Sequence, residues 1–224
     1  TQNNFANDSP WLASDQEFWA ELAPFAKRRF YPKNHYVYYQ GDHSNCFFWV
    51  KSGLVKVVIM HEGGLEKILS INGPGSLFGE TAAFDGKPYF ASALVIEDAE
   101  IWSVTADDLF CIFVTNPKLS KEILKSLTAK IRLLALQVED LTFFDALGRI
   151  ARTLVKLAHN CGQKEPAGIK ILHRLTHQEL ANLVGTSRVT VTNTLQYLKE
   201  TGVLEQKRGQ ITITDIDKLQ SLIM

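Results

Sequence analysis

The chain has 224 residues, of which 46% are hydrophobic and 21% charged, the composition of a soluble globular protein long enough for two domains. No apolar run approaches the length of a membrane-spanning helix, and the first residues lack a signal-peptide pattern, so we expect a cytoplasmic protein that does not enter a membrane. The net charge is zero, but from residue 143 onward Lys and Arg outnumber Asp and Glu by 11 to 7, against 13 to 17 before it. A mildly basic C-terminal part is compatible with binding nucleic acid.

The three cysteines, Cys46, Cys111 and Cys161, lie far apart and match no paired spacing. This argues against a disulfide framework and against a zinc site. Three cysteines are also too few for a four-cysteine iron–sulfur cluster in one subunit. We expect three reduced thiols.

The N-terminal part begins with a helical pattern. Ser14 and Glu17 have the spacing of a capping box, and Phe18, Leu22 and Phe25 fall on one face of the predicted helix.

Short β-branched and aromatic runs separated by Gly-rich turns follow. They predict a strand segment that contains Tyr31, Val37 and Tyr38, strands at 47–50, 53–60 and 67–71, and the last strands over 91–104. The 53–60 and 67–71 runs flank the turn at 62–64 and therefore predict a hairpin. Many short strands of this kind predict an antiparallel β-roll or jelly roll of about 90 residues.

Such a roll is also compatible with a cupin-like metalloenzyme that carries an accessory helical domain. That chemistry needs clustered His and carboxylate ligands. His35, His43 and His61 are scattered and lie mostly in predicted turns, and no Ser/His/Asp or paired-carboxylate pattern stands out. The enzyme is the weaker hypothesis, and we expect neither catalytic nor metal-binding residues.

The stretch 75–83 predicts a loop that runs into one helical turn. Small residues there would let the backbone approach a ligand, and a helix N-terminus attracts anions. The alternative is a tight corner of the roll that merely needs glycine.

A long helix is predicted from Leu119 to Phe143, because this stretch holds neither Pro nor Gly and Pro117 suits its start. Apolar residues recur in the alternating three-and-four spacing of a coiled-coil seam. They are Leu124, Leu127, Ile131, Leu134, Val138 and Leu141. We expect a parallel helix pair that makes the protein a homodimer; the alternative is a core helix of a single globule.

A further helix should begin at the capping residue Asp145, with an apolar stripe at Ala146, Ile150, Leu154 and Leu157. The stretch 160–168 is predicted to be a loop, and a short strand is predicted at 169–172.

Two short helices joined by a glycine turn are predicted next. Thr176 and Glu179 form a capping box, Gly185 supplies the turn, and Thr186 or Ser187 caps the second helix. The buried faces are Leu180, Leu183 and Val184 on the first helix and Val191, Leu195 and Leu198 on the second. This pattern predicts a helix-turn-helix.

Polar groups on the opposite face of the second helix suit DNA. Arg188, Val189, Thr192, Asn193 and Gln196 point away from the buried side. Arg can contact guanine, Asn adenine and Val a thymine methyl group. The alternative is a helical hairpin with a solvated polar face.

Other residues suit the phosphate backbone. Two strands predicted within 204–214 would form a wing with a basic tip, for which the alternative is a solvated turn. The full set of expected phosphate contacts is Thr176, Gln178, Ser187, Thr190, Thr192, Lys207 and Arg208.

The order of these parts resembles the catabolite activator/fumarate-nitrate regulator (CRP/FNR) family of bacterial transcription factors. The resemblance covers nearly the whole chain and is strongest at 143–154 and 175–198, with weaker support from Gly53, Gly73 and 78–80. It implies an α+β protein with an effector-sensing β-roll of the cyclic-nucleotide-binding type (1–116), a dimerisation helix (117–143) and a winged helix-turn-helix (144–224).

The resemblance also implies the function: a homodimeric, effector-responsive regulator, expected to be an activator, that binds a near-palindromic site on double-stranded DNA. The family's base readers fall on Arg188, Val189 and Asn193. Many members have Glu and Arg at the second and third of these positions, so the common operator sequences do not carry over. The stretch 159–168 lies where relatives touch RNA polymerase. A constitutive DNA binder whose roll only supports dimerisation is the alternative.

The effector is not identified by the sequence. Cyclic-nucleotide-binding members hold the phosphate with an Arg, whereas this chain has only Lys87 between Phe84 and Val104, which argues against cAMP and cGMP. Haem remains open, because spacing does not exclude a single His or Cys ligand.

Aromatic residues could line a pocket for a small apolar or aromatic molecule, or could be ordinary roll core. The run 125–131 also resembles the halogenated-phenol-sensing branch, in which a helix lysine faces the ligand anion. Lys130 is the candidate, and a solvated residue beside the seam is the alternative. The expected effector pocket is Phe78, Gly79, Glu80, Phe84, Tyr89, Phe90, Leu127, Lys130, Ile131 and Leu134.

Overall fold

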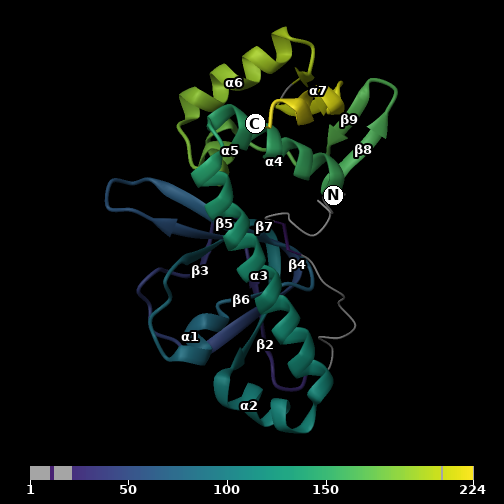
Figure 1. Ribbon diagram of the computed structural model, residues 1–224. Helices are drawn as coiled ribbons and strands as arrows, with labels where there is room; N and C mark the ends of the chain where they lie inside the picture. The colour runs from purple at the N-terminus through teal and green to yellow at the C-terminus, as the bar shows by residue number, and fades with distance from the viewer. Residues whose placement is uncertain (1–10, 13–21, 208, 224) are drawn as a thin grey trace. The chain divides into compact units, whose positions relative to one another are not determined.

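The computed structural model describes residues 11–12, 22–207 and 209–223 (Figure 1). They divide into two compact units, and the division falls inside one helix, α3 (Pro117–Phe143). Described residues up to Ile131 form the N-terminal unit, and those from Arg132 onward form the C-terminal unit. The first part of the expected N-terminal helix, from Ser14 to Phe18, lies outside the described residues. In its last part Leu22 is buried, but residues 23–25 form a turn and Phe25 is 48% exposed, so the prediction of a helix there is wrong. None of the described helices is long and apolar enough to cross a bilayer.

The N-terminal unit is a sheet that curves into the predicted β-roll. Its main path runs β1-β5-β4-β7-β2, with β3 paired to β7 and β6 to β4, and all pairs are antiparallel except β1 with β5. The strands are β1 (Trp11–Leu12), β2 (Lys27–Tyr31), β3 (Tyr36–Tyr38), β4 (Cys46–Met60), β5 (Glu66–Asn72), β6 (Leu77–Phe78) and β7 (Ser92–Thr105). The hairpin formed by β4 and β5 confirms the prediction. The segment predicted around Tyr31, Val37 and Tyr38 is divided into two strands, β2 and β3, and the stretch 91–104 holds one long strand, β7, instead of several.

The runs 47–50 and 53–60, predicted as separate strands, are one strand, β4. Its pairing with β7 shifts register between Val50 and Val55, so the strand bends instead of ending. Gly53 allows this bend, because its φ is 83° and a Cβ there would overlap the carbonyl oxygen of Asp98.

Two helices accompany the roll. The predicted helical turn is present as α1 (Glu80–Asp85). A second helix, α2 (Ala106–Thr115), was not predicted. Thr105 caps it by accepting a hydrogen bond from the amide of Asp108, and Leu109 and Ile112 are buried. The spacing of Thr105 and Asp108 is the sequence signal for the start of this helix. The apolar pattern of the preceding strand runs directly into the helix and hides its start.

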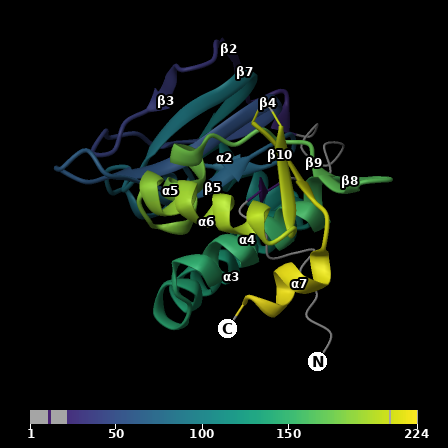
Figure 2. The same ribbon diagram turned by 90° about the horizontal axis from the view of Figure 1, so that it is seen from above.

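The C-terminal unit contains α4 (Ala146–Cys161), α5 (His177–Val184), α6 (Arg188–Glu200) and α7 (Ile216–Ser221), the last of which was not predicted. Its four-stranded sheet has the order β10-β11-β9-β8, made of β8 (Gly162–Glu165), β9 (Gly168–Ile171), β10 (Leu204–Lys207) and β11 (Gln210–Ile213). Figure 2 shows α5 beside α6, with β10 near the C-terminal end of α6.

The prediction of a loop over 160–168 is wrong. Strands β8 and β9 form an antiparallel hairpin closed by a turn at Pro166 and Ala167. The polar composition of β8 hid the strand, because β8 is mostly exposed and shows no apolar alternation.

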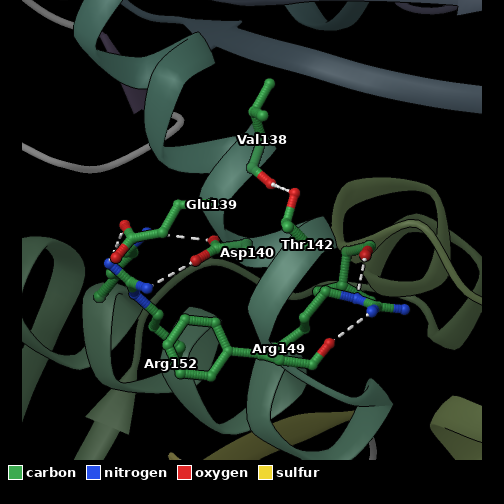
Figure 3. A network of polar contacts seen from close by, with 9 residues as sticks. Val138, Glu139, Asp140, Thr142, Arg149 and Arg152 are labelled. Atoms are coloured by element: carbon green, nitrogen blue, oxygen red, sulfur yellow. Dashed lines mark hydrogen bonds and ion pairs between the residues drawn. The ribbon is translucent and has the colours of Figure 1, made fainter.

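Ionic contacts fasten the C-terminal end of α3 to α4. Arg152, only 8% exposed, lies 3.0 Å from Glu139 Oε2 and 2.8 Å from Asp140 Oδ1 (Figure 3). Its guanidinium also lies over the ring of Phe144, 4.9 Å from the centroid. Lys156 Nζ approaches Asp140 Oδ2 at 3.5 Å. The junction between α3 and α4 is therefore held by a largely buried ionic cluster.

Arg149, one turn earlier on α4, connects this junction to the helix-turn-helix. Its guanidinium donates to the carbonyl oxygens of Phe144 at 2.8 Å, Val184 at 3.0 Å and Gly185 at 3.2 Å. The carbonyls at the end of α5 lack helical partners, so the arginine satisfies two of them.

Candidate nucleic-acid interface and effector site

The first helix of the helix-turn-helix begins and ends as predicted. Thr176 and Glu179 form the capping box at the start of α5. Gly185 closes α5 in the left-handed region, at φ 70°. Leu180, Leu183 and Val184 are buried, as the pattern predicted.

The second helix, α6, is capped by Ser187, whose side chain accepts from the amide of Thr190. Val191, Leu195 and Leu198 face the core and are at most 2% exposed. Because these three define the buried side, residues 188, 189 and 193 fall on the opposite side of the helix.

The expected base readers are exposed. Val189 is 68% exposed, and Arg188 and Asn193 are exposed as well. The side chains of Arg188 and Asn193 form no hydrogen bond or ion pair with the described part of the chain. Exposed groups of this kind are available to an external partner.

The expected phosphate contacts are mostly engaged inside the protein. The hydroxyl proton of Thr176 goes to Glu179 Oε2, and that of Thr192 goes to the carbonyl oxygen of Arg188. Ser187 and Thr190 share one hydroxyl–hydroxyl bond of 2.8 Å, which leaves one proton of the pair for a phosphate. Phosphate oxygens only accept, so a hydroxyl whose proton is used must break a bond to reach them.

The amide of Gln178 donates one hydrogen to Asn182 Oδ1 and retains another. On the wing formed by β10 and β11, Lys207 pairs with Glu205 at 2.7 Å, and both side chains are exposed. The hydrogen bond and charge of Glu205 raise the pKa of Lys207, and Lys207 in turn lowers the pKa of Glu205. Arg208 lies outside the described residues.

In the N-terminal unit, Lys130 turns inward. Its Nζ lies 2.7 Å from Glu80 Oε1 and donates to the carbonyl oxygen of Leu77 at 2.7 Å. The alternative of a solvated lysine beside the seam is therefore wrong. The sequence gives no signal for this contact, because 50 residues separate the two partners.

Gly79 precedes α1 in the left-handed region, and a Cβ there would lie 2.9 Å from Phe48 and 3.2 Å from Tyr38. The glycine therefore allows the start of α1 to approach the aromatic cluster closely.

The expected aromatic pocket residues do not gather in one place. Phe78 and Tyr89 belong to a core cluster with Tyr38 and Phe48, in which the rings of Tyr38 and Tyr89 stack at 3.8 Å. Phe84 instead packs against the other core cluster, facing Phe113, and Phe90 is 50% exposed. Tyr38 and Phe48 were not predicted as members, although both lie in predicted strands.

The two buried tyrosines carry strongly perturbed phenols. Burial raises the pKa of Tyr89 to about 12, and its hydroxyl donates to the carbonyl oxygen of Cys46 at 2.7 Å. Burial, followed by the charge of Glu80, raises the pKa of Tyr38 well above its usual value. Both phenol hydroxyls therefore keep their protons to a higher pH than an exposed tyrosine does.

The seam of α3 is exposed in the single chain. Exposed fractions are 63% for Leu124, 67% for Ile131, 42% for Leu134, 64% for Val138 and 49% for Leu141. Leu127 differs, because it packs against the core cluster of the N-terminal unit.

The described residues contain no group of three or more His, Cys, Asp or Glu side chains suited to a metal ion. Cys46, Cys111 and Cys161 are free thiols. Burial raises the pKa of Cys161.

Comparison with known proteins agrees with this architecture. Residues 28–116 match the model of the cyclic nucleotide-binding domain, and residues 148–222 match the Crp-like helix-turn-helix domain. The chain is 32% identical over 198 residues to the cyclic AMP receptor protein of Thermus thermophilus, covering 88% of each. It is 32% identical over 189 residues, 84% of each, to the CRP-like cAMP-activated global transcriptional regulator of Mycobacterium tuberculosis.

Among solved structures, a mutant of CooA from Carboxydothermus hydrogenoformans matches with a TM-score of 0.82 at 29% identity, covering 91% of this chain and 90% of that one. CprK in complex with OCPA shares the fold, with a TM-score of 0.77 at 23% identity and coverage of 93% and 94%. Both domain matches, the order of the domains and the extent of the sequence identity lead to one assignment: the chain belongs to the CRP/FNR family of DNA-binding transcription regulators.

Proposed function

We propose that this protein is a homodimeric, effector-responsive transcription activator that binds a near-palindromic promoter site through the major groove. The observation that carries the proposal is the exposed face of α6, on which Arg188, Val189 and Asn193 have no partner in the described part of the chain. These three side chains can read guanine, a thymine methyl group and adenine, respectively. They lie in the N-terminal half of the second helix, the part that meets base edges in helix-turn-helix proteins.

Dimer formation is supported by the exposed seam of α3. Leu124, Ile131 and Val138 are each more than 60% exposed and recur every seven residues. A parallel pair would remove these side chains from water and relate the two α6 helices by two-fold symmetry. Such a dimer reads two half-sites about 34 Å apart.

Most of the stretch 159–168, which is expected to touch RNA polymerase, lies in the β8–β9 hairpin. We assign the contact to the turn of this hairpin. The turn residues Pro166 and Ala167 are exposed.

Selection of bound duplexes from a random pool, followed by footprinting, tests the proposal. We expect a near-palindrome with half-site centres about 10 base pairs apart. Affinity should fall steeply as salt rises, because phosphate contacts release counterions. Absence of any protected palindrome at low salt would contradict the proposal.

We further propose that the effector is not a cyclic nucleotide, although two similar relatives are named as cAMP receptors or cAMP-activated regulators. Lys130 is already paired with Glu80, and Lys87 is exposed. A buried phosphate needs a cation. The proposed site adjoins α1 and the N-terminal half of α3, where a ligand would compete with Glu80 for Lys130.

Calorimetric titration with cAMP and cGMP tests this part separately. We expect no heat of binding at millimolar nucleotide. Micromolar binding of either nucleotide would contradict the assignment of the effector and leave the DNA-binding proposal standing.

A further inference from the structure

His177, the first residue of α5, contacts side chains of two other elements in the C-terminal unit. Its Nδ1 lies 2.8 Å from Thr192 Oγ1 on α6. Its Nε2 lies 3.2 Å from the side-chain nitrogen of Gln206 on β10. One half-buried imidazole thus connects the first helix of the helix-turn-helix, the second helix and the wing.

The directions of these hydrogen bonds follow from counting protons. The hydroxyl of Thr192 has one proton, and it goes to the carbonyl oxygen of Arg188 at 2.9 Å. Thr192 Oγ1 can therefore only accept from His177, which places the ring proton on Nδ1. A neutral imidazole protonated on Nδ1 has an acceptor at Nε2, and the amide of Gln206 donates to it. Every donor in this series of hydrogen bonds, from Gln206 through His177 and Thr192 to Arg188, then has an acceptor.

We propose that His177 is a positioning residue for operator recognition, which fixes α6 and the wing relative to α5 through Thr192 and Gln206. The inference rests on the proposed function, since it concerns how the proposed base readers are held. Thr192 lies next to Asn193 and one helical turn after Arg188, so a shift at its hydroxyl displaces both readers. Holding these elements before DNA arrives reduces the ordering cost of binding.

The same geometry assigns Thr192 a different role from the expected phosphate contact. Its proton is used within α6, and its oxygen already accepts from His177. A phosphate oxygen could reach this hydroxyl only if the bond to Arg188 were broken. Thr192 is therefore the link through which His177 acts on α6.

The test compares H177A, H177N and the wild-type full chain on the selected operator and on an unrelated duplex of equal length. In H177A both links are lost, and we expect operator affinity to fall roughly tenfold, the effect of losing two neutral hydrogen bonds. Affinity for the unrelated duplex and the slope of affinity against salt should not change, because no phosphate contact is removed. In H177N an amide donor replaces Nδ1, so we expect partial recovery, with only the wing link lost.

H61A is the matched control. His61 lies in the turn between β4 and β5, and its Nδ1 accepts from the amide of Gly63. We expect this variant to bind both duplexes as the wild type does.

A second measurement uses the free protein and needs no DNA. Long-range proton–nitrogen correlation at pH 8 should show the His177 ring protonated on Nδ1, and H177A should speed amide exchange in β10 and at the start of α6.

A ring protonated on Nε2 would overturn the proposal. Wild-type operator preference in H177A would overturn it too, as would equal losses on both duplexes with a shallower salt slope, which would make His177 a phosphate contact. If the wild type itself prefers no operator, the proposed function fails, and the ring tautomer still decides whether the link exists.

Discussion

Lys130 on α3 and Glu80 at the start of α1 form an ion pair with an Nζ–Oε1 distance of 2.7 Å. The lysine side chain is 18% exposed and the carboxylate 6%. Because both charges are largely removed from water, each needs the other to offset its desolvation. The pair therefore connects the helix that carries the dimer seam to the proposed effector site, within the N-terminal unit.

Replacing Lys130 with Met should destabilise the N-terminal unit. Glu80 would remain buried without its cation, and we expect a loss of about 3 kcal/mol in the free energy of unfolding. Urea unfolding followed by tryptophan fluorescence measures it, because all four tryptophans of the chain precede residue 103. The double variant K130M/E80Q should recover most of the loss, because no unpaired charge remains.

The control is K125M, on the same helix. Lys125 pairs with Glu122, but its side chain is 60% exposed, so we expect a change below about 0.5 kcal/mol. Equal urea midpoints for K130M and K125M would contradict the buried ion pair.

The junction between α3 and α4 gives a second prediction. In R152M, Asp140 and Glu139 lose their guanidinium partner, and we expect the C-terminal unit to lose about 2–3 kcal/mol. Hydrogen exchange of the α4 amides reports this loss. E139Q should cost only about 0.5 kcal/mol, since that side chain is 42% exposed. Unchanged protection of α4 in R152M would show that the cluster adds no stability.

The features predicted correctly from the sequence are those that local residues determine. The bounds of α3 follow from Pro117 and from an uninterrupted apolar repeat. The ends of α5 follow from the capping box at Thr176 and from Gly185, whose effects act within four residues. The helix-turn-helix was therefore predictable nearly residue by residue.

The missed features depend on contacts that no local pattern encodes. The partner of Lys130 lies 50 residues away, and the link from His177 to Gln206 spans 29. Strand β8 was missed because an exposed edge strand lacks apolar alternation. Phe84 and Tyr89 are close in the sequence, but Phe84 lies on α1 and packs against one core cluster, whereas Tyr89 lies in the loop after α1 and belongs to the other.

Alkaline pH should destabilise the N-terminal unit through Tyr89. Its pKa is about 12 in the folded protein and about 10 in the unfolded chain, so the unfolded state loses its proton first. The contribution is complete below pH ~10 and is lost as pH rises toward ~12, by on the order of 2 kcal/mol. Unfolding in urea across this range measures it. Y89F should make the free energy of unfolding less dependent on pH in this range. If the free energy of unfolding of Y89F declines equally steeply, other groups cause the decline.

The exposed seam predicts how the dimer can be broken. In V138E and I131E a carboxylate would face its symmetry mate in an apolar interface, and we expect sedimentation to show monomers. Operator affinity should fall at least a hundredfold, because one half-site supplies only half of the contacts. A129E is the matched control, since Ala129 is exposed on the opposite side of the helix from the seam. Dimeric V138E would contradict the proposed interface.

The final prediction concerns base reading by Arg188. The side chain is exposed near the N-terminal end of α6 and has no partner within the described chain. Truncation in R188A should cost about 1–3 kcal/mol of binding free energy and relax preference at one base pair of each half-site. Binding to a panel of operators with single substitutions measures both effects. H61A is again the control, since His61 lies in the turn between β4 and β5 of the N-terminal unit. If R188A instead weakens binding to every sequence equally and lowers the salt slope by about one, the guanidinium contacts a phosphate, and base reading falls to Val189 and Asn193.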